Sequence, residues 1–574
     1  MRTALLFPPQ ASPTYVPLGI SLLAAYVRQQ LGPGHVSCFD LNVAAWEQLA
    51  ALASGGERLL RFLRGQEGSF YDEGEYRRVL GDFTALQRGM AELARDARRY
   101  VEAGELSGLL GRLLDEQLRG VLAARPDRVG ISILFPQQLV FGLALARRLS
   151  AEIDGPWGLP PSAPAGTTAA AAAAQQQPEG GAGGGQLRLL LGGAALSSID
   201  TAELLAACPY LDGVVRGEGE PALLALCREP YPRTVPGLLQ RNPHGAPLLV
   251  RHPAGPPLAL DDLPPADFSG LELTRYLSPA PVLPVVSSRG CRWRRCRFCA
   301  HNHSFGAYRA KSAQRFVDEL EQQCRQHGVR HFYFADQYVA ASDLGRIAAA
   351  LLRRRLRIHF HVMGRPTHDY EEALLADLAR AGCRWISWGV ETGSQRLLDI
   401  AGKGTCVAEI RRVLERTAAA GISSLPMMLF GLPTSTDVDL EQTFELLESC
   451  YDRLEAMTAS SFVLYRGTPF GSRPEHYGME VVGRELLLSP QGRPVHSTRL
   501  HYKERAADGS LRPPRGALEV ARWEQRRRWL GESSLLEEIW AEHYLLHVAH
   551  RHEQGRDPAA GLDPPQPARD LVAS

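Results

Sequence analysis

The sequence of 574 residues lacks the features typical of membrane, secreted or nucleic-acid-binding proteins. No apolar run approaches the roughly 18–20 residues that a membrane span requires. The first ten residues contain a short apolar run that ends at two prolines, which is too little for a secretory signal. Lys and Arg number 64 against 63 Asp and Glu, so no net charge attracts nucleic acid or anionic lipid. We therefore expect a cytoplasmic protein without a membrane or nucleic-acid partner.

Lysine is almost absent, since Lys311, Lys403 and Lys503 are the only three and every other basic residue is arginine. Together with the abundant Ala, Gly and Pro, this indicates a GC-rich coding bias, so a cluster of arginines is weak support for function. Hydrophobic residues make up 45% of the chain, which suffices for several buried cores. At roughly 100–200 residues per domain, the length predicts several units.

Strands alternate with helices in the first part of the chain, which predicts an α/β fold with a doubly wound parallel sheet over residues 1–228. Two insertions interrupt it: amphipathic helices over 43–124, and a low-complexity segment over 155–186 that we expect to be disordered. Helices are expected at 18–29 and 139–149. The predicted strands are residues 4–7, 36–40, 128–134, 187–191 and 212–215.

A second alternating series predicts a partial, six-stranded TIM-type barrel over residues 281–470, because a complete barrel has eight strands. Ten prolines within residues 230–265 predict an extended linker over 229–280. Residues 471–574 should form a mainly helical carboxyl-terminal extension with a disordered end. The predicted barrel strands are residues 282–286, 331–336, 357–363, 385–391, 424–431 and 461–465, and the helices are 312–326, 342–356, 370–381, 408–420 and 439–454.

Side chains on alternate sides of a strand face different surroundings, and two of these strands divide by polarity. In residues 357–363, Ile358, Phe360 and Val362 share one side, whereas His359, His361 and Met363 share the other. Residues 385–391 divide in the same way. If the apolar sets pack beneath the helices, the polar sets line the interior, which predicts a cavity that holds a ligand.

Seven of the ten cysteines are scattered, but Cys291, Cys296 and Cys299 lie within nine residues after the first barrel strand. Loops in this position carry the active sites of barrel enzymes. Three thiolates can bind three irons of a [4Fe–4S] cluster, and the lack of a fourth nearby cysteine would leave one iron open to substrate. The alternative is structural zinc with His301 or His303 as the fourth ligand, in a scaffold or binding protein without radical chemistry.

The cysteine triad, the six-stranded series and several later segments resemble the radical S-adenosylmethionine (radical SAM) superfamily. The first part of the chain resembles the cobalamin-binding domain often fused to it, so the resemblance covers about residues 1–470. It implies that Cys291, Cys296 and Cys299 hold a [4Fe–4S] cluster whose open iron chelates S-adenosylmethionine. One electron then produces a 5′-deoxyadenosyl radical that takes hydrogen from the substrate. The family's first two cysteines are usually separated by three residues, whereas four separate them here.

The same resemblance implies a cosubstrate site at the carboxyl ends of the barrel strands. An aromatic residue near the adenine corresponds to Phe298, and the segment 389–394 after the fourth strand corresponds to a cosubstrate-binding segment of the family. The remaining residues lie on the same predicted rim. The site residues implied there are Phe298, Asp336, Arg365, Gly389, Glu391 and Gly431.

The cobalamin-binding domains carry Ser-x-Leu after one strand and Gly-Gly after a later one, which match Ser132-Ile133-Leu134 and Gly192-Gly193. A small hydroxyl and glycines let the backbone approach a bulky cofactor at the strand ends. Residues 17–19 and 216–220 also resemble segments of this fused architecture. No histidine occurs in residues 8–17, so the usual motif supplies no lower cobalt ligand.

The resemblance therefore implies a cobalamin-dependent radical SAM enzyme, most commonly a methyltransferase acting on an unactivated carbon. Its implied cofactors are a [4Fe–4S] cluster, S-adenosylmethionine and cobalamin. Its implied partners are a small-molecule or peptide substrate and an electron donor such as flavodoxin or ferredoxin.

Overall fold

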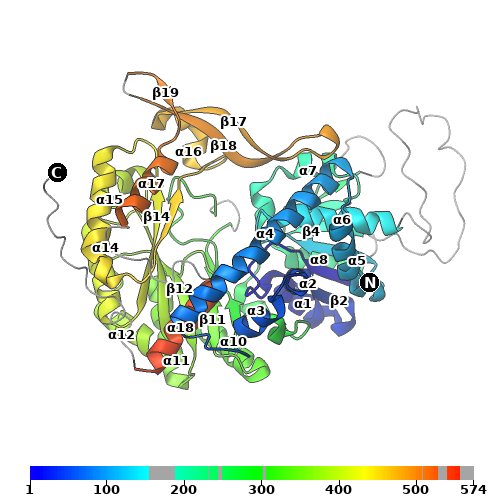
Figure 1. Ribbon diagram of the computed structural model, residues 1–574, viewed down its shortest axis with the longest axis horizontal. Helices are drawn as coiled ribbons and strands as arrows, with labels where there is room; N and C mark the ends of the chain where they lie inside the picture. The colour runs from blue at the N-terminus through cyan, green and yellow to red at the C-terminus, as the bar shows by residue number, and fades with distance from the viewer. Residues whose placement is uncertain are drawn as a thin grey trace, which may run out of the picture.

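The computed structural model describes residues 1–153, 188–229, 232–242, 249–301, 306–506, 508–527 and 540–555. Two parallel sheets with helices on their faces stand side by side, and an antiparallel hairpin crosses above them (Figure 1). The predicted low-complexity insertion 155–186 and residues 556–574 lie outside the described residues.

The amino-terminal sheet has seven strands in the order β2-β1-β3-β4-β5-β6-β7. Its first five strands are parallel and confirm the predicted doubly wound sheet: β1 (Thr3–Phe7), β2 (Val36–Asp40), β3 (Arg128–Ser132), β4 (Arg188–Gly192) and β5 (Gly213–Val215). The segment expected to be a linker adds β6 (Leu238–Arg241) and β7 (Leu249–Arg251), which pair antiparallel to this edge. Short apolar runs among its prolines are long enough for edge strands, which the proline content obscured.

Helices cover both faces of this sheet because its strands are apolar on both sides. Leu5 and Phe7 pack toward α1 (Leu18–Leu31) and α8 (Gly219–Arg228), whereas Ala4 and Leu6 pack toward the helices of the opposite face. The predicted insertion 43–124 is helical and contributes most of that opposite layer. Its helices are α2 (Leu41–Leu52), α3 (Gly56–Leu63), α4 (Glu73–Ala103) and α5 (Gly108–Ala123), and α6 (Gln138–Ile153) packs among them.

The second sheet has six parallel strands in the order β15-β14-β13-β12-β11-β8 and confirms the partial barrel. Its last strand ends at Ser461, where the sequence placed the start of the sixth strand. The helices lie outside the curved sheet (Figure 1). The strands are β8 (Val282–Val285), β11 (His331–Phe334), β12 (His359–Gly364), β13 (Cys383–Glu391), β14 (Ser423–Phe430) and β15 (Thr458–Ser461). The helices are α10 (Ala313–His327), α11 (Ala341–Arg354), α12 (Glu372–Ala381), α13 (Gln395–Ala401), α14 (Val407–Ala419) and α15 (Asp437–Cys450).

The predicted alternation of strand faces is correct. Phe360 and Val362 belong to the core beneath the helices, together with Ile386 and Trp388 of the next strand. His361 points to the opposite, concave face, where its ring stacks on Tyr333 with the centroids 4.3 Å apart. The concave face is therefore lined by polar and aromatic side chains.

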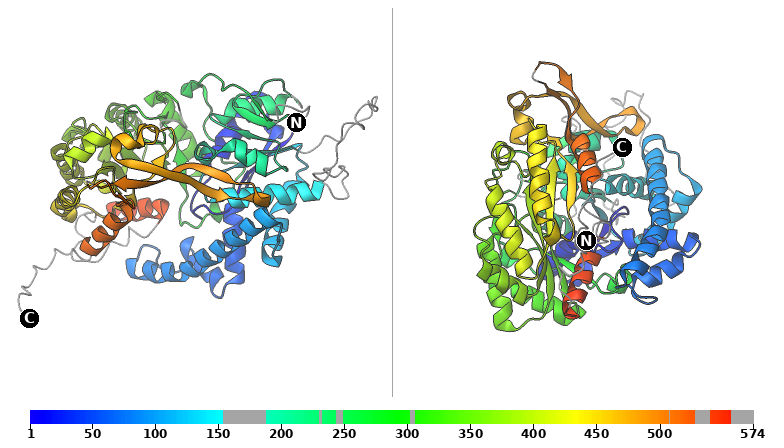
Figure 2. Two further views of the ribbon diagram at one scale, coloured as in Figure 1. Left: turned by 90° about the horizontal axis from the view of Figure 1, so that it is seen from above. Right: turned by 60° about the vertical axis from the view of Figure 1, so that its left-hand side comes forward.

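The carboxyl-terminal extension contains the expected helices and, in addition, a long hairpin that the sequence did not predict. Its strands are β17 (Met479–Leu488) and β18 (Val495–Arg505), with β16 (Leu464–Tyr465) and β19 (Leu511–Arg512) beside β18. The hairpin reaches from the barrel to the amino-terminal domain (Figures 1 and 2). There Arg484 forms ion pairs with Asp200 at 3.0 Å and Glu203 at 2.9 Å. Charged residues on both faces of the hairpin hide the period-two pattern of a strand.

Two helices in the described part of the extension pack on different parts of the barrel sheet. Helix α17 (Gly516–Arg527) buries Trp523 against the outer core near the end of β14. Helix α18 (Ala541–Glu553) lies inside the concave face, where Tyr544 contacts Trp385 with ring centroids 4.5 Å apart. Figure 2 shows α18 between the barrel sheet and the helices of the amino-terminal insertion.

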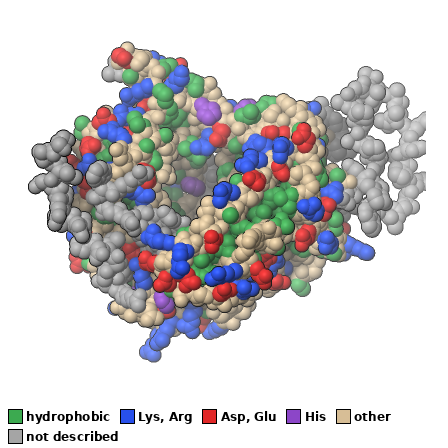
Figure 3. Space-filling view, viewed as in Figure 1, with side chains coloured by type: hydrophobic (Ala, Val, Ile, Leu, Met, Phe, Trp, Pro, Cys, Tyr) green, Lys and Arg blue, Asp and Glu red, His purple; other side chains and the backbone are tan. Residues whose placement is uncertain are grey.

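The distribution of charged side chains on the surface matches the near-neutral net charge of the chain. Arginine and acidic side chains are interspersed over the face in Figure 3 rather than separated into patches of one sign. Within the described ranges, no helix is both long and apolar enough to span a bilayer.

Candidate functional site

The three clustered cysteines lie on the loop after β8 and the short strand β9 (Ser288–Arg289). All three are free thiols and partly exposed. Burial raises the pKa of Cys296 to about 11, and the thiols of Cys299 and Cys291 add to this shift while Lys403 opposes it. The three thiols are therefore near enough to interact.

The two metal sites that the sequence allowed need different arrangements of ligands. A zinc site needs four ligands around one ion. Among the described residues, no three His, Cys, Asp or Glu side chains gather closely enough to hold one ion. His303 lies outside the described residues. An iron–sulfur cluster instead needs three thiolates that bind separate irons, which Cys291, Cys296 and Cys299 can supply.

Asp336, expected in the cosubstrate site, holds the start of the cysteine loop. Its side chain is buried, and its oxygens accept hydrogen bonds from the backbone and hydroxyl groups of Ser287 and Ser288 at 2.5–3.1 Å. Burial raises the pKa of Asp336, while these four hydrogen bonds act against the shift. With its oxygens so engaged, the carboxylate positions the loop.

Arg365 also contacts the cysteine loop, through a tryptophan that the sequence reading did not single out. The guanidinium lies 3.9 Å from the ring centroid of Trp293 and donates to the carbonyl oxygens of Lys403 and Gly404 at 3.0 and 2.6 Å. Trp293 Nε1 donates to Gly402 at 2.9 Å. Arg294 has a φ of 51°, so the extra residue of the four-residue spacing is accommodated in a left-handed turn.

The end of β13 carries a buried ion pair beside the cysteines. Lys403 Nζ lies 2.6 Å from Glu391 Oε1, and the two side chains are 8% and 13% exposed. Burial acts to lower the pKa of Lys403, but Glu391 and Cys296 raise it, so the net shift is upward. A Cβ at Gly389 would lie 2.7 Å from Lys403 Nζ, so a side chain at this position would displace the lysine head group. Lys403 was missed, although its rarity in an arginine-rich chain was a usable signal.

Phe298 and Gly431 lie nearer to the carboxyl-terminal extension than expected. Phe298 packs against an apolar cluster that includes Leu397 and Phe462. A Cβ on Gly431 would lie 2.3 Å from the backbone of Gly516, at the start of α17. The backbone N–H of Gly431 donates to Glu519 at 2.7 Å. Both residues therefore join the rim to the extension.

A cavity of about 590 Å³ follows one face of the amino-terminal sheet and opens onto the barrel. Leucines of β1, β4, α1 and α8 line its deep part. Ser132, Gly192 and Gly193 all lie in its wall. Gly193 has a φ of 108°, and a Cβ there would lie 2.3 Å from the carbonyl oxygen of Ile133. Nothing lies within 4 Å of a Cβ on Gly192, so this glycine faces open space.

The cysteine loop and this cavity are joined by a buried arginine. Arg289 is 11% exposed and pairs with Glu218 at 3.0 Å and with Glu220. Arg309 pairs with the same Glu218 at 2.5 Å. Burial acts to lower the pKa of Arg289, but the two carboxylates raise it. Since Ser288, Arg289 and Glu218 also line the cavity, its wall leads directly into the cysteine loop.

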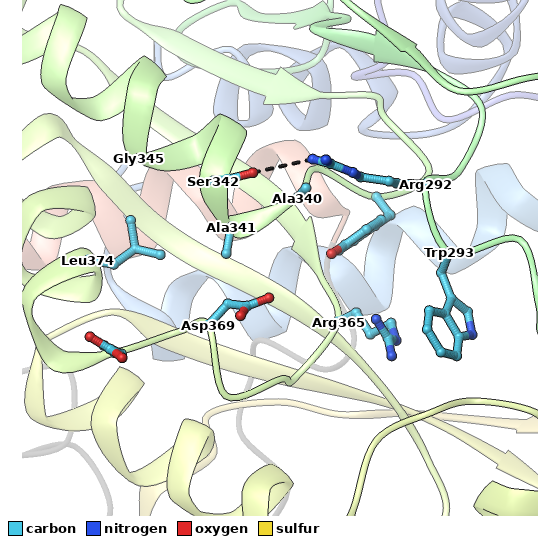
Figure 4. A pocket seen from close by; sticks show the side chains of 11 residues that line it. Arg292, Trp293, Ala340, Ala341, Ser342, Gly345, Arg365, Asp369 and Leu374 are labelled. Carbon is cyan, nitrogen blue, oxygen red and sulfur yellow. Dashed lines mark hydrogen bonds between the residues drawn. The ribbon is translucent and has the colours of Figure 1, made fainter.

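A second cavity, of about 690 Å³, lies on the outer side of the cysteine loop (Figure 4). Arg292, Trp293 and Arg365 face Asp369 across it, and Arg292 donates to Ser342 at 3.4 Å. The surface near the cysteines is therefore polar and accessible from outside.

Replacing Arg289 should separate the cysteine loop from the amino-terminal domain. In Arg289→Met, Glu220 loses its only ion pair among the described residues, and an unpaired buried carboxylate costs about 3–5 kcal/mol. We expect a lower unfolding temperature and less iron per chain after anaerobic reconstitution with iron and sulfide. Arg292→Met lies on the same loop, but its side chain is 58% exposed. This variant should keep the unfolding temperature and the iron content of the wild type. Unchanged iron and stability in Arg289→Met would contradict this role.

Comparison with known sequences and structures agrees with this geometry. Residues 285–447 match the radical SAM superfamily model. The anaerobic magnesium-protoporphyrin IX monomethyl ester cyclase of Rubrivivax gelatinosus is 28% identical over 294 residues, covering 49% of this chain and 51% of the relative. An uncharacterised methyltransferase of Pyrococcus horikoshii is 26% identical over 244 residues, covering 42% and 53%. The chain thus spans about half the length of these curated relatives.

Two solved structures share the arrangement of both domains at low sequence identity. The cobalamin-dependent radical enzyme OxsB, with aqua-cobalamin and S-adenosylmethionine bound, has a TM-score of 0.60 at 16% identity, covering 97% of this chain and 72% of its own. The methyltransferase TsrM of Kitasatospora setae, with cobalamin and a [4Fe–4S] cluster bound, has a TM-score of 0.54 at 16% identity, covering 84% and 77%. The protein therefore carries a radical SAM domain, joined to an amino-terminal domain in the fold of the cobalamin-dependent radical SAM enzymes.

Proposed function

We propose that the protein is a cobalamin-dependent radical SAM enzyme in which Cys291, Cys296 and Cys299 hold a [4Fe–4S] cluster. The observation that carries this proposal is the shared wall: Ser288 and Arg289 line the amino-terminal cavity and lead, two residues later, into Cys291. When bound, the cluster supplies the electron that cleaves S-adenosylmethionine, and cobalamin supplies a carrier for a methyl group. The protein's part is to hold the two sites against each other.

The Glu391–Lys403 pair suits the amino-acid end of S-adenosylmethionine. That end carries an ammonium and a carboxylate, which a carboxylate and an ammonium of the protein complement. Gly389 leaves room beside Lys403, and Phe298 offers an aromatic surface on the cysteine loop. In this proposal Asp336 and Arg365 position the loop, and Gly431 shapes the rim.

The amino-terminal cavity suits cobalamin. Its deep apolar part, between the sheet and helices α1 and α8, matches the flat aromatic tail of the cofactor. Ser132 can donate a hydrogen bond there, and Gly192 and Gly193 let the backbone approach the ring. Val286 and Ala335 of the barrel also line the cavity, so they would border a bound ring on its barrel side.

The reaction that this arrangement supports best is methyl transfer to an unactivated carbon of a small molecule or peptide. The substrate would lie inside the barrel, between the cysteine loop and the cavity opening. Ser288 and Arg289, which line the cavity wall and lead into the cysteine loop, support this position. The zinc scaffold is not favoured, because residues 285–447 match the radical SAM superfamily model.

Removing one thiol tests the cluster assignment. Wild-type protein reconstituted anaerobically should hold about four irons per chain and absorb broadly near roughly 400 nm. With S-adenosylmethionine and dithionite it should form 5′-deoxyadenosine. Cys299→Ala should lose most of the iron and all measurable 5′-deoxyadenosine, whereas Cys406→Ala, outside the triad, should behave as wild type. Full activity in Cys299→Ala would refute the ligand set.

Filling the cavity tests the cobalamin assignment. Gly192→Leu places a side chain in open cavity space without backbone clash, so hydroxocobalamin should bind at least about tenfold more weakly, as followed by absorbance titration. Gly81→Leu, also with nothing within 4 Å of its Cβ but on α4, should bind normally. Equal affinity in the two variants would place cobalamin elsewhere.

We further propose that an acidic electron donor, such as flavodoxin or ferredoxin, docks on the outer side of the cysteine loop. Arg292, Arg294 and Arg295 are exposed there, and the second cavity adjoins them. Opposite charges steer protein association and make it sensitive to salt. The cytoplasm suits such a partner, and all ten cysteines are free thiols, which fits a reducing compartment.

Reversing the charge of arginines on this loop should weaken binding of the electron donor without disturbing the cluster. Arg292→Glu combined with Arg295→Glu should raise the KM for reduced flavodoxin at least about fivefold, because the rim charges govern the encounter. The rate with dithionite should stay unchanged, since this small reductant needs no docking. Arg95→Glu, an exposed arginine on α4 of the amino-terminal insertion, is the control. An unchanged KM would exclude this docking face.

A further inference from the structure

The wall of the amino-terminal cavity carries more positive than negative charge. Its charged side chains are four arginines and two glutamates. Both glutamates, Glu218 and Glu220, are paired with Arg289. Arg128 is buried and donates to the backbone carbonyl oxygen of Glu229 at 3.0 Å. The excess positive charge of the wall therefore comes from its other two arginines.

These two arginines, Arg216 and Arg251, lie at the same edge of the sheet. Strand β5 ends directly before Arg216, and β7 ends at Arg251. Both strands run antiparallel to β6, so they are parallel to each other and their carboxyl ends share one edge. Ser132 and Gly192 end β3 and β4 at this same edge, which is where such sheets bind ligands.

Neither guanidinium group has a partner of its own. Within the part of the chain that the structure describes, the side chains of Arg216 and Arg251 form no hydrogen bond or ion pair, and both are exposed. Partial burial lowers the pKa of Arg216, Arg251 lowers it further, and Asp200 counteracts part of the shift. Asp200 is itself paired with Arg484 at 3.0 Å. An anion from outside the protein would therefore relieve the repulsion between the two arginines.

The surface around the two arginines is open enough for a ligand. Gly217 follows Arg216 and has a φ of 86°, and nothing lies within 4 Å of a Cβ placed there. Gly237 accepts the backbone N–H of Arg216 at 3.0 Å and also lines the cavity. The cavity leucines Leu190 and Leu226 are buried, whereas the arginines are exposed. The cavity thus passes from an apolar interior to a cationic rim.

We propose that Arg216 and Arg251 bind the phosphate group of the nucleotide tail of cobalamin. This inference rests on the proposed function and adds the binding groups for one part of the cofactor. The tail of cobalamin consists of a flat aromatic base joined through a ribose to a negatively charged phosphodiester. An apolar pocket that continues into a cationic rim complements this order of groups. Guanidinium groups bind phosphate oxygens through charge-assisted hydrogen bonds, which are stronger than neutral ones.

The test compares cobinamide phosphate with cobinamide, which lacks only the phosphate. Absorbance titration of the full chain should show cobinamide phosphate binding at least about tenfold more tightly. Arg216→Gln combined with Arg251→Gln should reduce this preference to about twofold or less and leave the affinity for cobinamide unchanged, because only the phosphate contacts are removed. The unfolding temperature should match that of the wild type, since neither guanidinium has a partner to lose.

A matched control carries two arginine substitutions elsewhere in the amino-terminal domain. Arg58 and Arg95 have side chains 78% and 69% exposed, and neither lines the cavity. Arg58→Gln combined with Arg95→Gln should therefore retain the full preference for cobinamide phosphate. A preference lost equally in both double variants would reflect the net charge of the protein and contradict the proposal.

Titration with hydroxocobalamin separates this inference from the proposed function. If the wild type does not bind hydroxocobalamin, the cobalamin assignment and the inference both fail. If it binds hydroxocobalamin but does not prefer cobinamide phosphate, or if the Arg216 and Arg251 double variant keeps the preference, the inference alone fails. Should the double variant unfold at a lower temperature, Arg251→Gln alone replaces it. This single variant should lower the preference at least about threefold, and an unchanged preference would contradict the proposal.

Discussion

The arrangement of the site depends on the buried arginine between the two domains. Arg289 extends from the strand before the cysteine loop and meets Glu218 and Glu220 at the start of α8. The hydrogen bonds between one arginine and two carboxylates fix the geometry of the three side chains. Separating them costs much free energy, because a buried charge without its partner is destabilising. The distance between the cysteine loop and the cavity is therefore set by an ion pair rather than by apolar packing alone.

Several anchors of the cysteine loop come from strand ends that follow it in the chain. Asp336 holds Ser287 and Ser288, and Arg365 stacks on Trp293. The Glu391–Lys403 pair lies beside Cys296. Each anchor is contributed by a different strand, so the loop takes its shape only when the barrel has formed. A longer spacing between the first two cysteines is compatible with this design, since the anchors hold the loop from outside.

Residues distant in the sequence complete the interior. The hairpin of β17 and β18 ties the barrel to α7 (Thr201–Ala207) and its capping residue Asp200, and α18 fills the concave face from the other side. Thr14 and Glu542 form a hydrogen bond although 528 residues separate them in the chain. Contacts between such distant segments belong to no single domain, which explains why no local motif reveals them.

The sequence by itself determined the two α/β units and the strand faces around Phe360 and His361, and it placed three cysteines on one loop. These follow from short-range rules: side chains alternate along a strand, and clustered thiols bind metal. The positioning roles of Asp336 and Arg365, the partner of Glu391, the long hairpin and the placement of Glu542 were decided by the tertiary structure. A carboxylate or guanidinium serves equally well as an anchor, an ion-pair partner or a ligand. Only the neighbours that folding brings within hydrogen-bonding distance select among these roles.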